Sequence, residues 1–354
     1  MKLTIGTARL QAMLNKAVKG ASCNKNIPMT SLIAIKLSGG TLTLTTTDST
    51  NYLSVVEHDV EGDEFYVAVK VEILAKLVAR MTCDEVTLEV TNSSLDVIGN
   101  GKYQIDIPLE DDGSLVRLPN PVETFDKGNK IGTVDTSVIL KVLSSLKPAL
   151  ATTDEYMCFT CYYIKDHITA TDTYTVADCK RGFLEEPKLV SSVVMDLLGL
   201  FSGTISVYQS GDNMLFEAEN GIVYGSIPSG IENYSIDAIK ALVTQAYANY
   251  CMVVKSSLLN LLERISLFVG AYDNGKITLA FDEHGLTVTS RYASERIDYV
   301  SGTLGEFTCQ TDVNTLMTQV KAQTGSEIVI EYGEENAIKL IDDDVTTVVA
   351  LLEE

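Results

Sequence analysis

Three short runs in this chain alternate apolar residues with threonine, as a strand with one buried face does. They read LTLTTTD at 42–48, HITATD at 167–172 and GLTVTS at 285–290. The runs lie about evenly along the chain, at intervals of about 120 residues, and a fixed interval is typical of a repeated structural unit. We therefore expect a unit that occurs three times.

Apolar residues at i, i+3, i+4 and i+7 predict amphipathic helices at the same interval. One series comprises Leu10, Met13, Leu14 and Ala17, then Ile139, Val142, Leu143 and Leu146, then Leu258, Leu261, Leu262 and Ile265. A second series follows the threonine runs and comprises Leu74, Leu77, Val78 and Met81, then Val194, Leu197, Leu198 and Phe201, then Val313, Leu316, Met317 and Val320. Helices and strands that keep one interval indicate three tandem repeats.

Each repeat begins with a strand and a helix, continues with several strands and a second helix, and ends in a hairpin with a polar turn. The boundaries fall near 125 and 248, so we predict domains at 1–125, 126–248 and 249–354. The first boundary lies in RLPNPVETFDKGNK, where Pro and Gly favour a linker. The predicted fold class is α+β, with two helices packed on antiparallel sheets in each domain.

Length and composition indicate a globular protein, since 354 residues with 45% apolar content suit two or three domains. No apolar run approaches the ~20 residues of a membrane span, and the first residues lack a signal-peptide core. We therefore expect a soluble, cytoplasmic protein with no membrane partner.

The net charge of −21 argues at first against nucleic acid as a partner, because phosphate binding is mostly cationic. The helices differ from the rest of the chain. Six helix windows carry +8 in total and leave −29 for the remainder: 10–20, 70–81, 138–147, 188–202, 255–268 and 313–321. Solvent-facing lysines on amphipathic helices would explain these cations, but not the scarcity of Asp and Glu beside them. The contrast favours a positive surface within a negative molecule, which attracts a polyanion to one face.

The seven cysteines and three histidines show no metal-site spacing. Cys158 and Cys161 form a CxxC, but their segment MCFTCYYI reads as a strand, in which residues three apart face opposite sides. No second pair of Cys or His lies nearby in sequence to complete a tetrahedral site. We expect neither a metal nor another cofactor.

Carboxylate clusters at 110–112 and 342–344 could supply an acid/base pair for an enzyme. Runs of like charge are more often solvated loops, and neither cluster has a neighbouring histidine or a glycine-rich phosphate loop. The chain also lacks GxSxG and any Cys/His nucleophile arrangement. We therefore expect a protein that is not an enzyme.

The order, spacing and length of these segments together resemble the bacterial DNA polymerase III beta subunit family, the sliding clamps. The similar segments are the MKLTI start, IPMTSLIAIKLSGGTLTLTTTD, GDEFYVAVKVEILAKLVARM and VTLEVTNSSLDVIGNGKYQIDIPLEDD in the first repeat, and ITATDTYTVA in the second. The resemblance extends from Met1 to Glu354. It implies a head-to-tail homodimer that closes into a ring, with helices lining the hole and sheets forming the rim.

Such a ring encircles duplex DNA without reading its sequence and is the processivity factor that tethers the replicative polymerase. The resemblance makes the helix cations phosphate-facing, and contacts of this kind position a protein without specifying sequence. The DNA-facing candidates are Lys16, Lys19, Lys25, Lys70, Lys76, Arg80, Lys141, Lys147, Lys255 and Arg264. The implied place of work is the cytoplasm, on the nucleoid.

The resemblance also implies two protein-binding surfaces. By position, Leu267 and Phe268 match the apolar pair at the family's dimer interface, although both could instead be core residues at a helix end. A groove between the middle and last domains takes short peptides from polymerases, the clamp loader and repair proteins. Its lining here would be Phe159, Thr171, Thr173, Val176, Ile239, Val348, Val349, Ala350, Leu351 and Leu352.

Three positions depart from the family's groove. The chain ends in VVALLEE, Thr175 stands where a basic residue is common, and Ile239 stands where a proline is common. These departures indicate a divergent member of the family. They leave open an alternative, a clamp-like peptide-binding or decoy protein without a DNA-tethering role.

Overall fold

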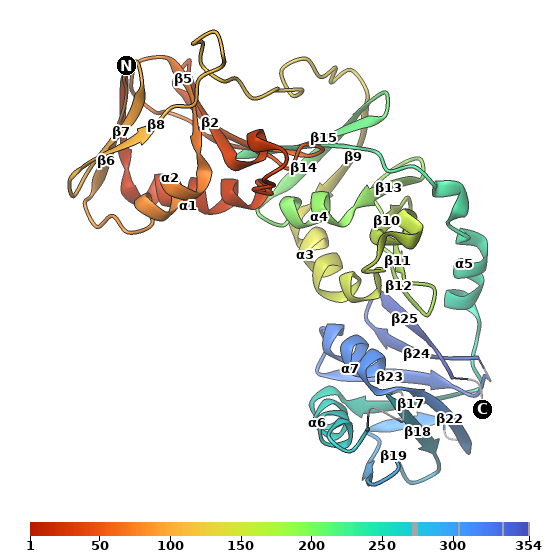
Figure 1. Cartoon of the computed structure of the whole chain (residues 1–354). Coiled ribbons are helices and arrows are strands. Elements are labelled where there is room, and N and C mark those ends of the chain that lie inside the picture. Colours follow the sequence, from red (N-terminus) through yellow and green to blue (C-terminus); the bar gives the residue numbers. More distant parts are fainter. Residues whose placement is uncertain (271–274, 304, 335, 353–354) are drawn as a thin grey trace. The chain divides into compact units, whose positions relative to one another are not determined.

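The chain forms two compact units, and each is described by itself (Figure 1). Unit 1 comprises Met1–Ser137 and Val193–Ile227, and unit 2 comprises Val138–Ser192 and Pro228–Glu354. The structure is a computed structural model that describes residues 1–270, 275–303, 305–334 and 336–352, the side chains of 154–156 excepted. The two units divide the predicted middle domain between them.

Unit 1 contains two antiparallel sheets and the helices that cover them (Figure 1). The four-stranded sheet has the order β1-β6-β7-β8, and the eight-stranded sheet has the order β5-β2-β3-β4-β16-β15-β14-β9. The helices are α1 (Thr7–Ala17), α2 (Val71–Val78) and α4 (Ser192–Leu198). The strands are β1 (Lys2–Gly6), β2 (Leu32–Ser38), β3 (Thr41–Thr47), β4 (Tyr52–Glu57), β5 (Phe65–Lys70), β6 (Glu85–Val90), β7 (Ser94–Ile98), β8 (Lys102–Asp106), β9 (Lys130–Asp135), β14 (Thr204–Ser210), β15 (Asn213–Ala218) and β16 (Gly221–Ser226).

Unit 2 also contains two antiparallel sheets. The nine-stranded sheet has the order β13-β10-β11-β12-β25-β24-β23-β17-β21, and the four-stranded sheet has the order β20-β19-β18-β22. The helices are α3 (Thr136–Ser145), α5 (Ile236–Thr244), α6 (Lys255–Ser266) and α7 (Val313–Ala322). The strands are β10 (Cys161–Ile164), β11 (Ile168–Thr171), β12 (Thr175–Cys179), β13 (Lys188–Ser191), β17 (Asn249–Val254), β18 (Lys276–Phe281), β19 (Leu286–Thr289), β20 (Ser294–Ile297), β21 (Ser301–Thr303), β22 (Phe307–Asp312), β23 (Glu327–Tyr332), β24 (Ala337–Asp342) and β25 (Val345–Ala350).

All six predicted helices are present, as α1, α2, α3, α4, α6 and α7, with ends within one turn of the predicted ones. Their predicted apolar stripes are buried, except that Leu77, Leu143 and Met317 are half-buried. In α6, for example, Leu258, Leu261 and Leu262 are fully buried and Ile265 is 2% exposed. Since burying one such side chain contributes about 1.5–3 kcal/mol, this stripe accounts for the attachment of the helix to its sheets. The α+β fold class is confirmed.

The three threonine runs form β3, β11 and β19, and each turns tightly into the next strand. The turns are equivalent, because the backbone N–H donates to the carbonyl three residues later in each of Asp48–Asn51, Asp172–Thr175 and Ser290–Ala293. Strands β4, β12 and β20 therefore occupy the same place in the three repeats. Residues counted from these turns can therefore be matched between the three repeats.

The prediction of a strand over MCFTCYYI is wrong for the first half of this segment. Residues Asp154–Thr160 form a 3₁₀ helix, and the strand begins at Cys161. Because Cys158 lies in the 3₁₀ helix and only Cys161 lies in the strand, the alternation of a strand does not apply to them, and both join one apolar cluster. The described part of the chain holds no cluster of three or more His, Cys, Asp or Glu arranged for a metal ion.

No helix among the described residues is long and apolar enough to span a membrane.

Candidate functional site

An apolar cluster in unit 2 joins the nine-stranded sheet to the segment around α5. Its buried members are Cys158, Cys161, Tyr163, Val176, Leu189, Tyr234, Ile239, Ala337 and Val348, and Phe159, Ile231, Ile236 and Val243 pack against it. We call it the tyrosine cluster, because the rings of Tyr163 and Tyr234 stack with their centroids 5.4 Å apart. The Tyr234 hydroxyl donates to the Thr169 carbonyl over 3.0 Å, and burial raises the pKa of Tyr234 well above its ordinary value. This ring therefore stays neutral and fixes the segment before α5 to the sheet.

The tyrosine cluster brings together some of the predicted groove residues and not others. Val176, Ile239 and Val348 are members, and Phe159 packs against it. Val349 and Leu351 instead pack in the core of the third repeat, because successive side chains of an extended chain point to opposite faces. The sequence pattern did not identify Tyr163, Leu189 and Tyr234 as members of this cluster. Of the three, only Tyr163 could have been recognised, because it is an apolar position two residues from Cys161.

Exposed apolar side chains occur on the same elements as the tyrosine cluster. The exposed fractions are 55% for Met157, 74% for Tyr174, 38% for Leu242 and 40% for Leu352. The predicted groove residue Thr173 is exposed, Ala350 is half-buried and Thr171 is buried. Large apolar groups held partly in water beside a buried apolar patch are typical of a protein-binding surface.

Thr173 lies in a strained turn between β11 and β12. Its φ of 79° is rare for a β-branched residue and costs on the order of 1–3 kcal/mol. The turn is held by hydrogen bonds from the Thr173 N–H to Thr171 Oγ1 (3.0 Å) and from the Thr175 N–H to Asp172 Oδ1 (2.6 Å). The equivalent Ser49 in the first repeat has a φ of 90°, so this conformation belongs to the repeated turn.

Lys339 of β24 fixes the segment that follows α5. Its side chain is 3% exposed and lies 3.5 Å from a Glu331 carboxylate oxygen. The ammonium donates to the Gln245 carbonyl and lies 4.5 Å from the Tyr247 ring centroid. A buried charge needs such partners, so this lysine positions the end of α5, which carries Ile239.

The predicted DNA-facing cations fall into two groups. Lys19, Lys25, Lys70 and Arg80 are exposed and form no ion pair with any residue that the structure describes. They flank α1 and α2 in unit 1. Lys147 is also exposed, and Lys16 is half-buried with its ammonium 5.4 Å from the Phe201 ring centroid.

The remaining candidates have partners within the protein. Lys76 pairs with Glu72, and Arg264 of α6 pairs with Glu295 of β20. Lys255 donates to the carbonyls of Lys321 and Gln323 at the end of α7. A cation already paired contributes less to phosphate binding, because the existing interaction must be given up.

Lys141 belongs to an ion cluster with the carboxylates at 342–344. It pairs with Asp343 at 3.0 Å and with Asp344, which also pairs with Arg181. Burial raises the pKa of Asp344, but these two cations lower it further, so the net shift is downward. The expectation of a solvated loop is wrong here for Asp344 and for Asp342, which is buried and accepts the Gly325 N–H at 2.9 Å. It is confirmed for 110–112, where all three carboxylates are exposed.

Two strand pairings join consecutive repeats, and both have the same register. Strand β4 pairs with β16, and β12 pairs with β25. Leu53 lies opposite Val223 in the first pairing, and Ala177 lies opposite Thr347 in the second. Counted from the equivalent turns, Leu53 and Ala177 correspond to Glu295 of β20. Val223, Thr347 and Tyr103 of β8 also correspond to one another. They lie opposite Phe216, Leu340 and Val97 respectively, which occupy the same position in the preceding strand of each repeat.

Strand β20 corresponds to β4 and β12, and strand β8 corresponds to β16 and β25. Both β20 and β8 are edge strands of four-stranded sheets. Lys102, Tyr103 and Gln104 of β8 are exposed, Tyr103 by 41%. An edge strand with an exposed aromatic residue is a template for pairing with another chain.

Leu267 and Phe268 follow α6, which packs against β20. Leu267 is 81% exposed and Phe268 is 50% exposed, so the alternative that both are core residues is wrong.

Residues 1–113 match the family model described as the DNA polymerase III beta subunit, N-terminal domain. No curated protein matches the chain. Among solved structures, the chain is similar to the DNA polymerase sliding clamp from Bacillus subtilis, with 17% identity, a TM-score of 0.84, and coverage of 100% of this chain and 99% of that one. It is also similar to the beta subunit from DNA polymerase of Streptococcus pyogenes, with 15% identity, a TM-score of 0.86 and full coverage of both chains.

A third similar structure is a sliding clamp from Pseudomonas aeruginosa bound to griselimycin, with 14% identity, a TM-score of 0.86 and full coverage of both chains. At these identities the likeness to solved structures shows the fold. Together with the family model, it confirms the resemblance that the sequence indicated.

Proposed function

We propose that the chain, whose residues 1–113 match the model of the DNA polymerase III beta subunit N-terminal domain, is a member of that family and acts as a sliding clamp. In this proposal two copies form a ring around duplex DNA and tether the replicative polymerase as a processivity factor. The protein performs no catalysis. Its work is in the cytoplasm, on nucleoid DNA.

The main support for the proposal is that one strand of each of two equivalent sets is left without the pairing that the other members of its set form within the described chain. Three repeats supply three strands of the β4 type and three of the β8 type. Two pairings between them lie within the chain, β4 with β16 and β12 with β25. The strands left over are β20 and β8, which belong to the third and the first repeat. Pairing β20 of one copy with β8 of a second copy is a head-to-tail contact, and two such contacts close a dimer.

The shared register of the inner pairings predicts the register of this interface. Glu295 of one copy lies opposite Tyr103 of the other, and Arg296 lies opposite Lys102. The apolar pair Leu267–Phe268 lies beside this edge, because α6 is fixed to β20 by the ion pair between Arg264 and Glu295. The pair then becomes buried when the second copy docks.

The exposed cations around α1 and α2 support sequence-independent DNA binding. Lys19, Lys25, Lys70 and Arg80 are free of protein carboxylates in the part of the chain that the structure describes. In a chain of net charge −21, a local positive region directs phosphate to one face and repels it elsewhere. A closed ring needs only weak contacts of this kind, because topology keeps the DNA in place.

The tyrosine cluster and its exposed rim support a peptide-binding groove, with the polymerase, the clamp loader and repair proteins as partners. Apolar pockets with few polar anchors bind extended peptides through their side chains. Thr175 and Ile239 stand where the family commonly has a basic residue and a proline. We therefore propose a peptide preference that differs from that of other clamps.

Retention on circular DNA tests the proposed ring. Protein loaded on a closed circle is expected to co-elute with the DNA in gel filtration and to be lost once a restriction enzyme linearises the circle. A linear duplex blocked at both ends by bound protein is the control, and it should retain the ring. Equal loss from circles and from open linear DNA would contradict the sliding-clamp proposal and favour a peptide-binding protein alone.

Removal of the last five residues, 350–354, tests the peptide groove. The backbone N–H groups of Leu351 and Leu352 donate to the carbonyls of Asn336, just before β24, and Gln310 of β22, so this end is fixed beside those two strands. Its loss is expected to weaken binding of a glutamine-leucine-phenylalanine peptide at least tenfold, since an apolar anchor of this size contributes about 1.5–3 kcal/mol. Fluorescence polarisation measures this affinity. An unchanged affinity together with an unchanged dimer would place the groove elsewhere.

A further inference from the structure

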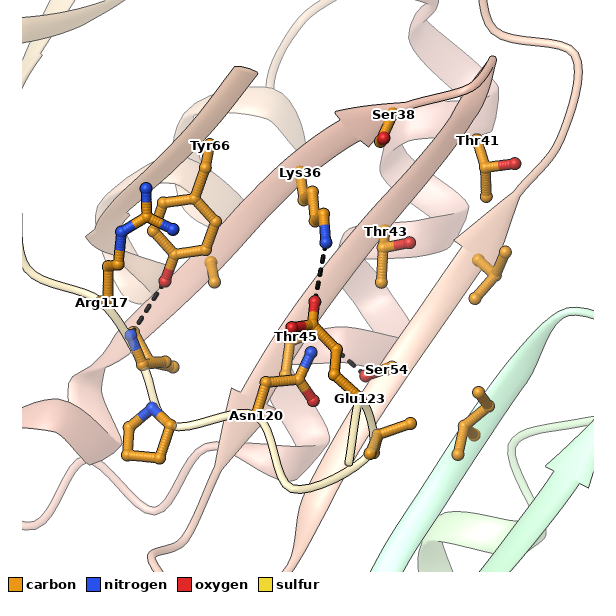
Figure 2. Close-up of a pocket in the computed structure, with 16 residues that line it drawn as sticks. Lys36, Ser38, Thr41, Thr43, Thr45, Ser54, Tyr66, Arg117, Asn120 and Glu123 are labelled. Carbon is orange, nitrogen blue, oxygen red and sulfur yellow. Dashed lines mark hydrogen bonds and ion pairs between the residues drawn. The ribbon is translucent and has the colours of Figure 1, made fainter. Parts of the chain in front are cut away.

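A hollow of about 480 Å³ lies on the eight-stranded sheet of unit 1, beside residues 117–123 of the linker (Figure 2). Strand β3 contributes the hydroxyl-bearing residues Thr41, Thr43 and Thr45 to its floor, and β2 contributes Lys36. Cavities of roughly 300–1,000 Å³ hold small molecules or peptide side chains. This hollow belongs to neither the DNA-facing helices nor the tyrosine cluster.

The hollow exists because the first repeat has small side chains where the second repeat has large ones. The registers make Ala34 equivalent to Tyr163, since these residues lie opposite Thr45 and Thr169 respectively. Ser54 is equivalent to Asp178 by the next pairing. The ring of Tyr234 also fills this face in the second repeat, whereas the linker supplies the smaller Leu118 in the first. The first repeat therefore lacks the two stacked rings of the second, and Tyr66 is the aromatic residue that lines its hollow.

Charged groups on two sides of the hollow make it suited to a carboxylate. Figure 2 shows Lys36 directed at Glu123 of the linker, and these residues pair at 2.7 Å. Arg117 lies at the rim with its guanidinium 4.9 Å from the Tyr66 ring centroid. Arg117 is exposed and pairs with no carboxylate among the residues described. The hollow therefore carries one uncompensated positive charge in a strongly negative protein.

A buried acceptor in the hollow has no partner. The Oδ1 atom of Asn120 is inaccessible to solvent and accepts no hydrogen bond from any described residue. The Asn120 side chain lies near Glu123 and contributes, after the larger effect of Lys36, to lowering the pKa of that carboxyl. An unsatisfied buried acceptor costs about 1–3 kcal/mol, and a ligand N–H would remove that cost.

The hollow continues past the linker into a second one of about 460 Å³, which shares Pro119 and Asn120 with the first. Tyr52 and Tyr224 line this second part, with their ring centroids 5.8 Å apart. Two hollows that meet at the same two residues form an elongated site. Its length suits an extended chain better than a single small acid.

We propose that this site binds an extended peptide of a partner protein through one Asp or Glu side chain. The peptide carboxylate pairs with Arg117, and a peptide N–H donates to Asn120 Oδ1 once rotation of the Asn120 side chain turns that atom toward the hollow. These linker residues are three positions apart, and three extended residues span about 10 Å, so both contacts fit within one short peptide. The Lys36–Glu123 pair stays intact and keeps the linker at the side of the site.

The test uses the acetylated and amidated tripeptide Ala-Glu-Ala, titrated into ¹⁵N-labelled full-length protein and followed by NMR. We expect saturable shifts of the Asn120 side-chain amide and of backbone amides at 117–123, with a Kd of about 1–10 mM for so few contacts. Ala-Gln-Ala should bind at least tenfold more weakly. N-acetylglutamate, a free acid, should also bind more weakly, since it does not extend to the second hollow.

Matched variants separate this site from non-specific binding. Arg117→Glu should raise the Kd at least tenfold, and Asn120→Leu about fivefold. Arg291→Glu is the control, because Arg291 is an exposed arginine beside a tyrosine ring in unit 2, 5.3 Å from the Tyr292 centroid. It should leave the Kd unchanged. Equal binding of the Gln peptide, an unaffected Arg117→Glu protein, or no saturable shift at 117–123 would overturn the proposal, whatever the fate of the ring.

Discussion

Replacement of both Leu267 and Phe268 by aspartate is expected to convert the protein from a dimer of about twice 38.5 kDa to a monomer. The two side chains are 81% and 50% exposed, so the variant loses no core contact. Burying a leucine and a phenylalanine contributes roughly 1.5–3 kcal/mol each, and burying a carboxylate in their place is costly. A closed dimer contains two such contacts, so about 6 kcal/mol or more is lost in total, and at 1.4 kcal/mol for each factor of ten the dimer Kd should rise at least about ten-thousandfold.

Light scattering at micromolar concentration measures this change, with thermal unfolding as a check that the monomer is folded. Leu242→Asp is the matched control, because Leu242 is an exposed apolar residue of α5 at 38% exposure. It should remain dimeric. A double variant that stays a dimer would show that the copies associate through another surface, and the proposed pairing of β8 with β20 would lose its support.

The repeat could be predicted from the sequence because it depends on local periodicity. Apolar positions such as Leu10 and Leu258 recur in helices of the same phase, and alternation in the threonine runs determines which face of each strand is buried. These signals require no knowledge of distant partners. They are sufficient for the fold class and for six helices.

The functional surfaces depended on contacts that periodicity does not encode. The ion pair between Lys141 and Asp344 joins residues 203 positions apart, so a lysine expected to face phosphate is partly neutralised. Tyr234 joins the groove region through a 3₁₀ turn that no apolar pattern marks. At Leu267 and Phe268 an apolar pair suited both a core and an interface, and only its exposure distinguished the two.

Replacement of Lys19, Lys25, Lys70 and Arg80 by glutamate is expected to abolish binding of the protein to duplex DNA at physiological salt. These four cations are the exposed candidates around α1 and α2 that have no ion pair in the described part of the chain. The change lowers the charge of each copy by 8. Because each phosphate contact contributes a slope of about −0.9 to the dependence of log K on log salt, the variant should show both weaker binding and a flatter slope.

Fluorescence anisotropy of a labelled duplex measures this effect, at several salt concentrations and with the dimer verified by light scattering. An affinity loss of at least a hundredfold is expected when several phosphate contacts are replaced by repulsion. The control changes Lys2, Lys130, Lys180 and Lys276 to glutamate, which alters the net charge equally at exposed positions on or beside strands. If the cations act through their place beside the helices, this control should bind nearly as the wild type does. Equal losses in both variants would mean that total charge governs binding, and the helix surfaces would then have no special part in holding DNA.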